Sequence, residues 1–154
     1  MAQISAPALQ TIEAGQNAVF TATFISPSEL GIILPNTDSS SLYLRGVFRP
    51  QFNTCGCNRN FFTDFYASFS ANVQIPTGGT VDEIAVAISI NGEPIQTSIM
   101  RTNPAAVEEF ANISTQVYIP IPKGTVQSIS VENIGAQAID MQNANLTVFM
   151  PRMR

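Results

Sequence analysis

The chain has 154 residues, of which 45% are hydrophobic and 12% charged, so it can bury one ordinary core and is predicted to be a single domain. Seven basic and eleven acidic residues give a net charge of −4, which argues against a protein that binds nucleic acid by neutralising phosphates. The absence of histidine removes Ser–His and Cys–His pairs and imidazole metal ligands. We therefore expect neither an enzyme nor a nucleic-acid-binding protein.

Uncharged polar residues dominate the rest of the composition. Serine, threonine, asparagine and glutamine far outnumber the charged residues, so they supply most of the solvated surface. A weakly charged surface does not resist contact with copies of itself, which favours an oligomer. No segment approaches the roughly 20 apolar residues of a membrane span, and the N-terminal residues lack the regions of a signal peptide. We expect no membrane contact and no classical secretion.

Alternating apolar and polar residues predict a series of β-strands. In chain order, the expected strands cover 16–25, 41–48, 65–75, 84–90, 95–100, 113–119, 125–132 and 143–150. Asn91-Gly92 predicts a tight hairpin because both residues tolerate positive φ, whereas 104–110 is too short for a helix and is predicted to be a loop. Eight to ten strands indicate an all-β antiparallel sandwich, either a jelly roll or an immunoglobulin-like domain, although the Cys–Trp–Cys set of the latter is missing.

The two cysteines, Cys55 and Cys57, lie in a predicted loop, so no disulfide framework holds this fold together. One chain supplies two soft ligands where a structural zinc site needs about four. We interpret them as loop thiols. The alternative is a metal or redox site between subunits, because three copies would bring six thiols together. We predict no cofactor and no catalytic residue.

Aromatic residues concentrate around the cysteine loop and the strand after it. Phe65 and Phe69 fall on the apolar face of that strand and are predicted core residues. Four others fall in the loop or on the polar face: Phe52, Phe61, Phe62 and Tyr66. Rigid aromatic side chains often anchor interfaces, so we favour a subunit contact over the alternative, a surface that stacks on sugars.

Four segments resemble a known fold family: 14–20 (AGQNAVF), 74–79 (QIPTGG), 88–92 (ISING) and 142–148 (QNANLTV). They are similar to the tumour-necrosis-factor-like (TNF-like) jelly roll, which is also the fold of the globular head of complement's first component. Within that fold, Leu44-Arg45-Gly46, the cysteine loop and 104–108 (PAAVE) are most similar to uncharacterised proteins of gut-bacterial phages and prophages. The resemblance implies a short N-terminal arm (1–10), one jelly-roll domain (11–150) and a C-terminal tail (151–154).

The resemblance also implies a function. The protein is expected to be a homotrimeric structural protein of a bacteriophage virion, a capsid decoration, head fibre or tail module made in the bacterial cytoplasm and displayed on the particle surface. Its expected partners are itself and capsid or other virion proteins. The alternative is a carbohydrate-binding adhesion module that attaches the particle to host-surface glycans. Besides the four aromatic residues above, the candidates for the threefold interface are Ser68, Ser70, Asn72, Asn143, Asn145 and Phe149.

Overall fold

The structure, a computed structural model, describes residues 1–47 and 61–151 and contains two antiparallel β-sheets. The strands of sheet A are β1 (Ala2–Ala6), β2 (Gln10–Ile12), β3 (Ala22–Ile25), β6 (Phe62–Gln74), β10 (Ala111–Pro122) and β12 (Ile139–Phe149). The strands of sheet B are β4 (Ile33–Pro35), β5 (Ser41–Arg45), β7 (Ile84–Ile90), β8 (Glu93–Pro94), β9 (Met100–Thr102) and β11 (Val126–Asn133). Two short 3-10 turns, η1 (Pro27–Glu29) and η2 (Gln96–Ser98), complete the described elements.

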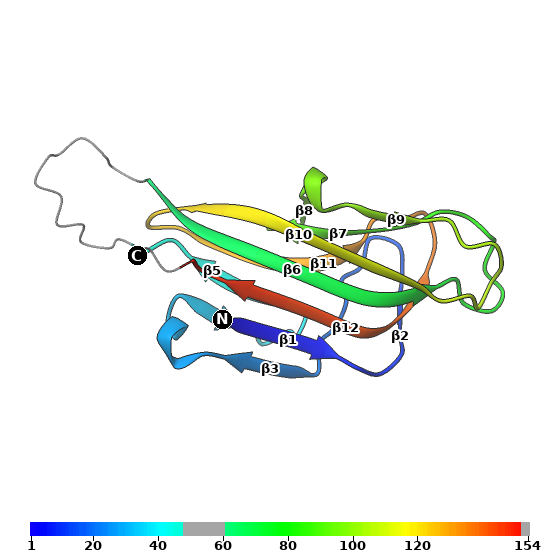
Figure 1. The fold of residues 1–154 in the computed structure, drawn as a ribbon, viewed down its shortest axis with the longest axis horizontal. Coiled ribbons are helices and arrows are strands. Elements are labelled where there is room, and N and C mark those ends of the chain that lie inside the picture. The colour runs from blue at the N-terminus through cyan, green and yellow to red at the C-terminus, as the bar shows by residue number, and fades with distance from the viewer. Residues whose placement is uncertain (48–60, 152–154) are drawn as a thin grey trace, which may run out of the picture.

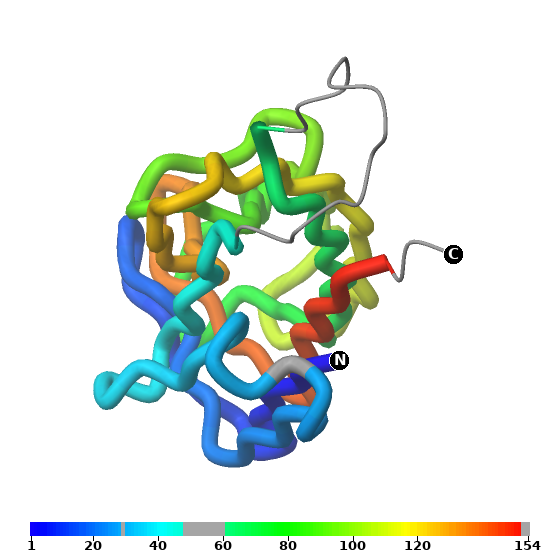
Figure 2. Tube along the Cα trace, turned by 90° about the vertical axis from the view of Figure 1, so that its left-hand side faces the viewer, coloured from blue at the N-terminus to red at the C-terminus, as the bar shows by residue number. Residues whose placement is uncertain are grey.

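The two sheets form the predicted jelly-roll sandwich (Figure 1). Sheet A has the order β10-β6-β12-β1-β3, with β2 also paired to β12, and sheet B has the order β4-β5-β11-β7-β8, with β9 also paired to β7. Figure 2 shows the two layers from one end, with β12 (red) and β6 (green) on one side and β11 (orange) and β5 (cyan) on the other.

The part of the chain that the structure describes contains no helix with the length and apolar composition of a membrane span.

The core lies between the sheets and confirms the alternation read from the sequence. In β6 the side chains predicted for the apolar face are buried: Phe65, Ala67, Phe69, Ala71 and Val73. Thr63 and Gln74 are buried as well, although the alternation assigns Gln74 to the polar face. The apolar side chains of β6 pack against the inward side chains of sheet B, which include Leu42, Leu44, Ile88, Ile129 and Val131. Burial of the phenylalanine, leucine, isoleucine and valine side chains in this set, each contributing about 1.5–3 kcal/mol, is the main force that holds the sheets together.

The N-terminal residues form a strand of sheet A, so the predicted arm over 1–10 is wrong. Strand β1 lies between β12 and β3, with Ala2 opposite Val148 and Ile25. Ala2 and Ile4 are buried against the core. The five residues of β1 alternate with period two, but both strands that pair with it come from elsewhere in the chain, so the local pattern does not show that it joins the sheet.

The predicted strand over 16–25 is also wrong as a single element, because this segment crosses from one sheet to the other. The Ala18 N–H donates to Val131 O in sheet B (2.8 Å), whereas the Thr21 N–H donates to Ser5 O in sheet A (2.9 Å). The change of sheet interrupts the alternation. Phe20 is 4% exposed, but Phe24, which the same pattern assigns to the core, is 57% exposed.

The hairpin at Asn91-Gly92 is confirmed, because both residues have positive φ, 51° and 82°, and β8 returns antiparallel to β7. The expected return strand over 95–100 is interrupted by η2 before β9 resumes the pairing. There the Ser98 hydroxyl accepts a hydrogen bond from the Ile88 N–H (3.0 Å) and so replaces a missing strand partner. The segment 104–110 is a loop, as predicted.

Candidate functional site

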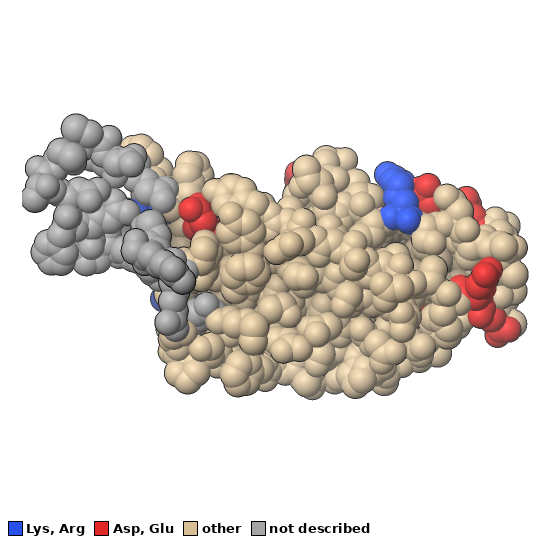
Figure 3. Space-filling model, viewed as in Figure 1, with Lys and Arg blue, Asp and Glu red and all other residues tan. Residues whose placement is uncertain are grey.

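The outer face of sheet A, the side turned away from sheet B, carries almost only uncharged side chains. Its outward residues include Gln3 and Ser5 in β1, Tyr66, Ser68, Ser70 and Asn72 in β6, Asn112, Ser114, Gln116 and Tyr118 in β10, and Gln142, Asn145, Thr147 and Phe149 in β12. Charged residues on this face, Asp64 and Asp140, lie toward its two ends. Figure 3, in the same view as Figure 1, shows a broad surface over sheet A without blue or red atoms. Such a face meets no charge repulsion from a second copy.

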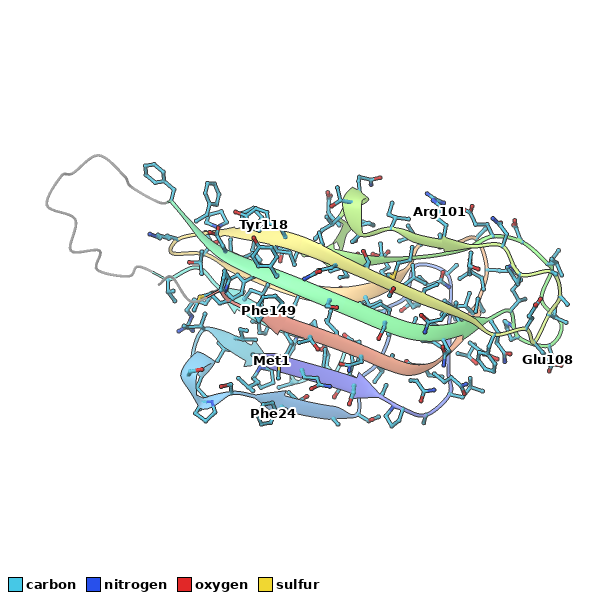
Figure 4. The ribbon with its side chains drawn as sticks, viewed as in Figure 1. Met1, Phe24, Arg101, Glu108, Tyr118 and Phe149 are labelled. Carbon is cyan, nitrogen blue, oxygen red and sulfur yellow. The ribbon has the colours of Figure 1, made fainter. Side chains whose placement is uncertain are left out.

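Three aromatic side chains lie in contact at one end of this face, and we call them the aromatic cluster: Tyr66, Tyr118 and Phe149. The ring centroid of Tyr66 lies 5.6 Å from that of Phe149, with 18° between the planes, and 5.4 Å from that of Tyr118, with 48° between the planes. The strand registers place Tyr66 directly opposite both residues. Figure 4 shows Tyr118 and Phe149 on the same face of sheet A.

A hydrogen bond from Tyr118 to Asp64 fixes one edge of the aromatic cluster. The Tyr118 hydroxyl donates to Asp64 Oδ1 over 2.8 Å. This bond, with smaller contributions from burial and from the negative charge of Asp64, raises the pKa of the Tyr118 phenol above its ordinary value. Tyr118 is 48% exposed, so the cluster presents aromatic surface to a partner.

The aromatic cluster shows what the sequence found and what it missed. Tyr66 and Phe149 were candidates from separate strands, and the structure brings them into contact. Tyr118 was not a candidate, although the alternation over 113–119 already assigns it to the polar face. The missing information was the pairing of β10 with β6, which sets Tyr118 opposite Tyr66.

Beyond the aromatic cluster, the outer face of sheet A carries uncharged polar side chains. Ser68, Ser70 and Asn72 lie along β6, and Asn145 is paired with Ser70 from β12. The Asn112 side-chain amide donates to Asn72 Oδ1 over 3.1 Å. These residues carry hydrogen-bonding groups without charge, which suits a surface that contacts a copy of itself.

Asn143 is displaced from the ladder that holds the other β12 candidates. The register of β12 against β6 shifts between Gln142 and Asn145, and Asn143 has a φ of 53°. Asparagine tolerates this left-handed conformation better than most residues, so it suits the extra position of a bulge. The bulge separates Asn143 from the regular face that Asn145 and Phe149 share.

Two further aromatic candidates, Phe61 and Phe62, lie at the beginning of β6. Phe61 precedes the strand and is 66% exposed, and Phe62 opens it opposite Pro122. Phe52 lies outside the described residues, as do Cys55 and Cys57. Among the residues that the structure describes, no group of three or more histidine, cysteine or carboxylate side chains could hold a metal ion.

The opposite end of the molecule carries carboxylates engaged with local partners. Glu83 pairs with Arg101, and the Glu108 carboxylate accepts a hydrogen bond from the Thr77 hydroxyl. The Glu109 carboxylate accepts one from the Ala105 N–H (3.0 Å). Figure 4 shows Glu108 at this end of the molecule. These bonds tie the loops at this end of the molecule together.

Comparisons with known proteins identify the fold. No model of a known protein family matches the sequence. No curated protein sequence is similar to it. The globular domain of zebrafish complement 1qA protein superposes with a TM-score of 0.61 at 9% identity, over 99% of this chain and 98% of that chain. Eiger TNF from S. frugiperda superposes with a TM-score of 0.62 at 6% identity, over 99% and 92%. The chain therefore has the TNF-like jelly-roll fold.

Proposed function

We propose that the protein is a non-enzymatic homotrimer that assembles through the outer face of sheet A and serves as a structural module on the surface of a bacteriophage particle. The observation that carries the proposal is the aromatic cluster at the end of a hydrogen-bonding face whose charged residues, Asp64 and Asp140, lie only toward its ends. Exposed aromatic side chains surrounded by neutral polar groups are the usual composition of an interface centre and its margin.

The geometry favours a contact between copies over a membrane or nucleic-acid contact. The face offers no basic side chains among its described residues, so it has nothing to neutralise phosphate or an anionic lipid headgroup. Identical neutral faces do not repel one another, and a closed ring of three copies would cover each face once. The jelly-roll fold supports a threefold arrangement through the resemblance stated above.

The first experiment is the mass of the protein in solution by light scattering, with Tyr66→Glu as the test variant and Val81→Lys as a matched control. Val81 is 49% exposed and lies in the turn after β6, away from the aromatic cluster. We expect three chains for the wild type and for Val81→Lys, and one chain for Tyr66→Glu, because a carboxylate in the stack would be buried without a partner. A wild-type monomer at high concentration would overturn the trimer.

The particle role needs a second measurement. Purified trimer, mixed with phage particles that lack this protein, should sediment with them, whereas Tyr66→Glu should remain in solution. Equal binding by the two proteins would contradict a trimeric decoration.

One observation favours a second candidate function, binding of host glycans. Exposed aromatic rings next to a carboxylate, here Tyr118 and Asp64, are suited to stack on a sugar and to accept its hydroxyl hydrogens. A glycan array probed with the wild-type protein tests this. Glycan binding would be supported if the wild-type protein gave array signals that both Tyr118→Ala and Asp64→Asn lost. An array on which the wild-type protein gives no signal would reject it.

A further inference from the structure

Strand β3 is an open edge of sheet A. It pairs only with β1 among the strands that the structure describes. The Ser26 N–H donates to Met1 O (2.8 Å), which makes Met1 and Ser26 a hydrogen-bonded pair. Such pairs alternate in an antiparallel ladder, so Phe24 bonds with Gln3, and the N–H and C=O groups of Thr23 and Ile25 point away from β1.

The other edge strands of the described residues are protected against pairing. Prolines occupy β4, β8 and β10, at Pro35, Pro94, Pro120 and Pro122, and β9 carries the charged Arg101. The edge of β2 is closed by the Gln10 side chain, which exchanges hydrogen bonds of 2.9 and 2.8 Å with Val19 O and the Val19 N–H. Proline, charge and cover are the usual devices that keep a sheet edge from joining another sheet.

Strand β3 has none of these devices. Its residues and those around it, from 14 to 28, include no charged side chain, and 21–26 contains neither proline nor glycine. Ala22, Thr23 and Phe24 are all exposed, Phe24 at 57%. Figure 4 shows Phe24 at the margin of sheet A. A short, uncharged, β-branched and aromatic strand of this kind is a template for an added strand.

We propose that β3 pairs antiparallel with β3 of a second copy, so that sheet A continues from one molecule into the next. The free backbone groups define the register. Thr23 of each copy faces Ile25 of the other in a hydrogen-bonded pair, and the twofold axis passes between the two Phe24 residues. This central pair is not hydrogen-bonded, so its Cα atoms lie about 4.5 Å apart and the rings stack on the same face.

A second copy fits this edge better than a charged peptide of another protein. The absence of charge from 14 to 28 leaves nothing to attract such a peptide, whereas two identical neutral strands meet without repulsion. The proposed register also satisfies the outward groups of Thr23 and Ile25 in both copies at once. This contact uses the edge of the sheet and is independent of the aromatic cluster, so in a trimer it would link one trimer to its neighbours.

The register gives a sharp test by disulfide trapping in a protein whose native cysteines are replaced by Cys55→Ser and Cys57→Ser. Phe24→Cys should form a disulfide-linked dimer under mild oxidation with oxidised glutathione, because 4.5 Å between Cα atoms is within disulfide range. The matched control is Ala22→Cys, on the same face of the same strand, which the register sets opposite Ser26 of the copy. We expect at least about tenfold faster cross-linking of Phe24→Cys, and equal rates would overturn the proposal.

Two further variants separate this contact from the proposed trimer. The trapping is repeated with Tyr66→Glu added, which removes the proposed trimer contact but leaves β3 unchanged, so the Phe24→Cys dimer should persist. Sedimentation velocity of the protein with its native cysteines should show species larger than the proposed trimer, and their fraction should rise with protein concentration. Phe24→Lys should abolish these larger species and leave the trimer unchanged. Pairing through β3 would be contradicted if the Phe24→Cys dimer were lost when Tyr66→Glu is added. It would also be contradicted if Phe24→Lys associated as strongly as the wild type.

Discussion

Tyr66 and Phe149 stack with 5.6 Å between their ring centroids and 18° between their planes, although 82 residues separate them in the chain. The contact arises because β6 and β12 are neighbours in sheet A and their register places the two residues directly opposite each other. Tyr118 joins from the other side of β6, so each outer ring of the aromatic cluster contacts Tyr66. This makes Tyr66 the residue on which the arrangement of the cluster depends.

Phe149→Ala should weaken the trimer by removing one side of the stack. Truncating an aromatic anchor of an interface costs about 2 kcal/mol of binding free energy, which corresponds to about a thirtyfold higher dissociation constant. Light scattering over a dilution series measures this constant. Thr147→Ala, two residues away on the same strand and face, should change it far less. Equal effects of the two substitutions would show that the stack does not hold the copies together.

The hydrogen bond between Tyr118 and Asp64 predicts a tyrosine with a raised pKa. Ultraviolet titration should show Tyr118 ionising at a higher pH in the wild type than in Asp64→Asn, which lacks the carboxylate that accepts the Tyr118 hydroxyl hydrogen. Because the folded pKa is raised, the stabilisation is fully present below the unfolded pKa of about 10 and is lost as pH rises through the folded value. Asp82→Asn, which removes a carboxylate elsewhere, should leave the tyrosine titration unchanged.

Gly46→Ala should destabilise the fold because the backbone of another segment passes too close for a side chain. A Cβ at Gly46 would lie 2.1 Å from the carbonyl oxygen of Pro122, and the Gly46 N–H also donates to Thr125 O (2.8 Å). Backbone must move to relieve such a clash, so we expect a loss of more than about 2 kcal/mol of unfolding free energy.

Urea unfolding of Gly46→Ala is compared with that of Gly31→Ala. Gly31 has a φ of 86° but open space around its Cβ position, so it reports the left-handed backbone cost of about 1–2 kcal/mol alone. A smaller loss for Gly46→Ala than for Gly31→Ala would contradict the close approach to Pro122.

Asp140→Ala should destabilise the end of sheet A opposite the aromatic cluster. Asp140 is 8% exposed and accepts hydrogen bonds from the Thr11 hydroxyl (2.7 Å) and the Gln74 side-chain amide (3.2 Å). Removing the carboxylate leaves the buried Gln74 side-chain amide without its partner, and Gln74 Oε1 already has none among the described residues, whereas the exposed Thr11 hydroxyl can bond to water instead. We expect a loss of about 1–3 kcal/mol in thermal or urea unfolding.

The control for Asp140→Ala is Thr97→Ala, in the exposed η2 turn, which should stay within about 0.5 kcal/mol of the wild type. If the two variants unfold alike, the buried Asp140 network contributes nothing to stability.

The sequence by itself determined the fold class and the facing of most strands. Period-two alternation correctly assigned Phe65 and Phe69 to the core and Tyr66 to the surface, because successive side chains on a strand must point to opposite faces. Asn91-Gly92 identified its hairpin because few other residue pairs accept two positive φ values. The scarcity of charged residues in the whole chain was likewise visible in the composition, whereas their absence from most of the outer face of sheet A needed the strand registers.

Only the tertiary structure decided which strands are neighbours. Alternation fixes the face of a side chain but not the strand beside it, so it could not place Tyr118 against Tyr66. It also could not show that 16–25 changes sheets, which leaves Phe24 on an open edge, or that a bulge displaces Asn143. Pairing between distant strands is set by the packing of both sheets around one core, which no local pattern contains.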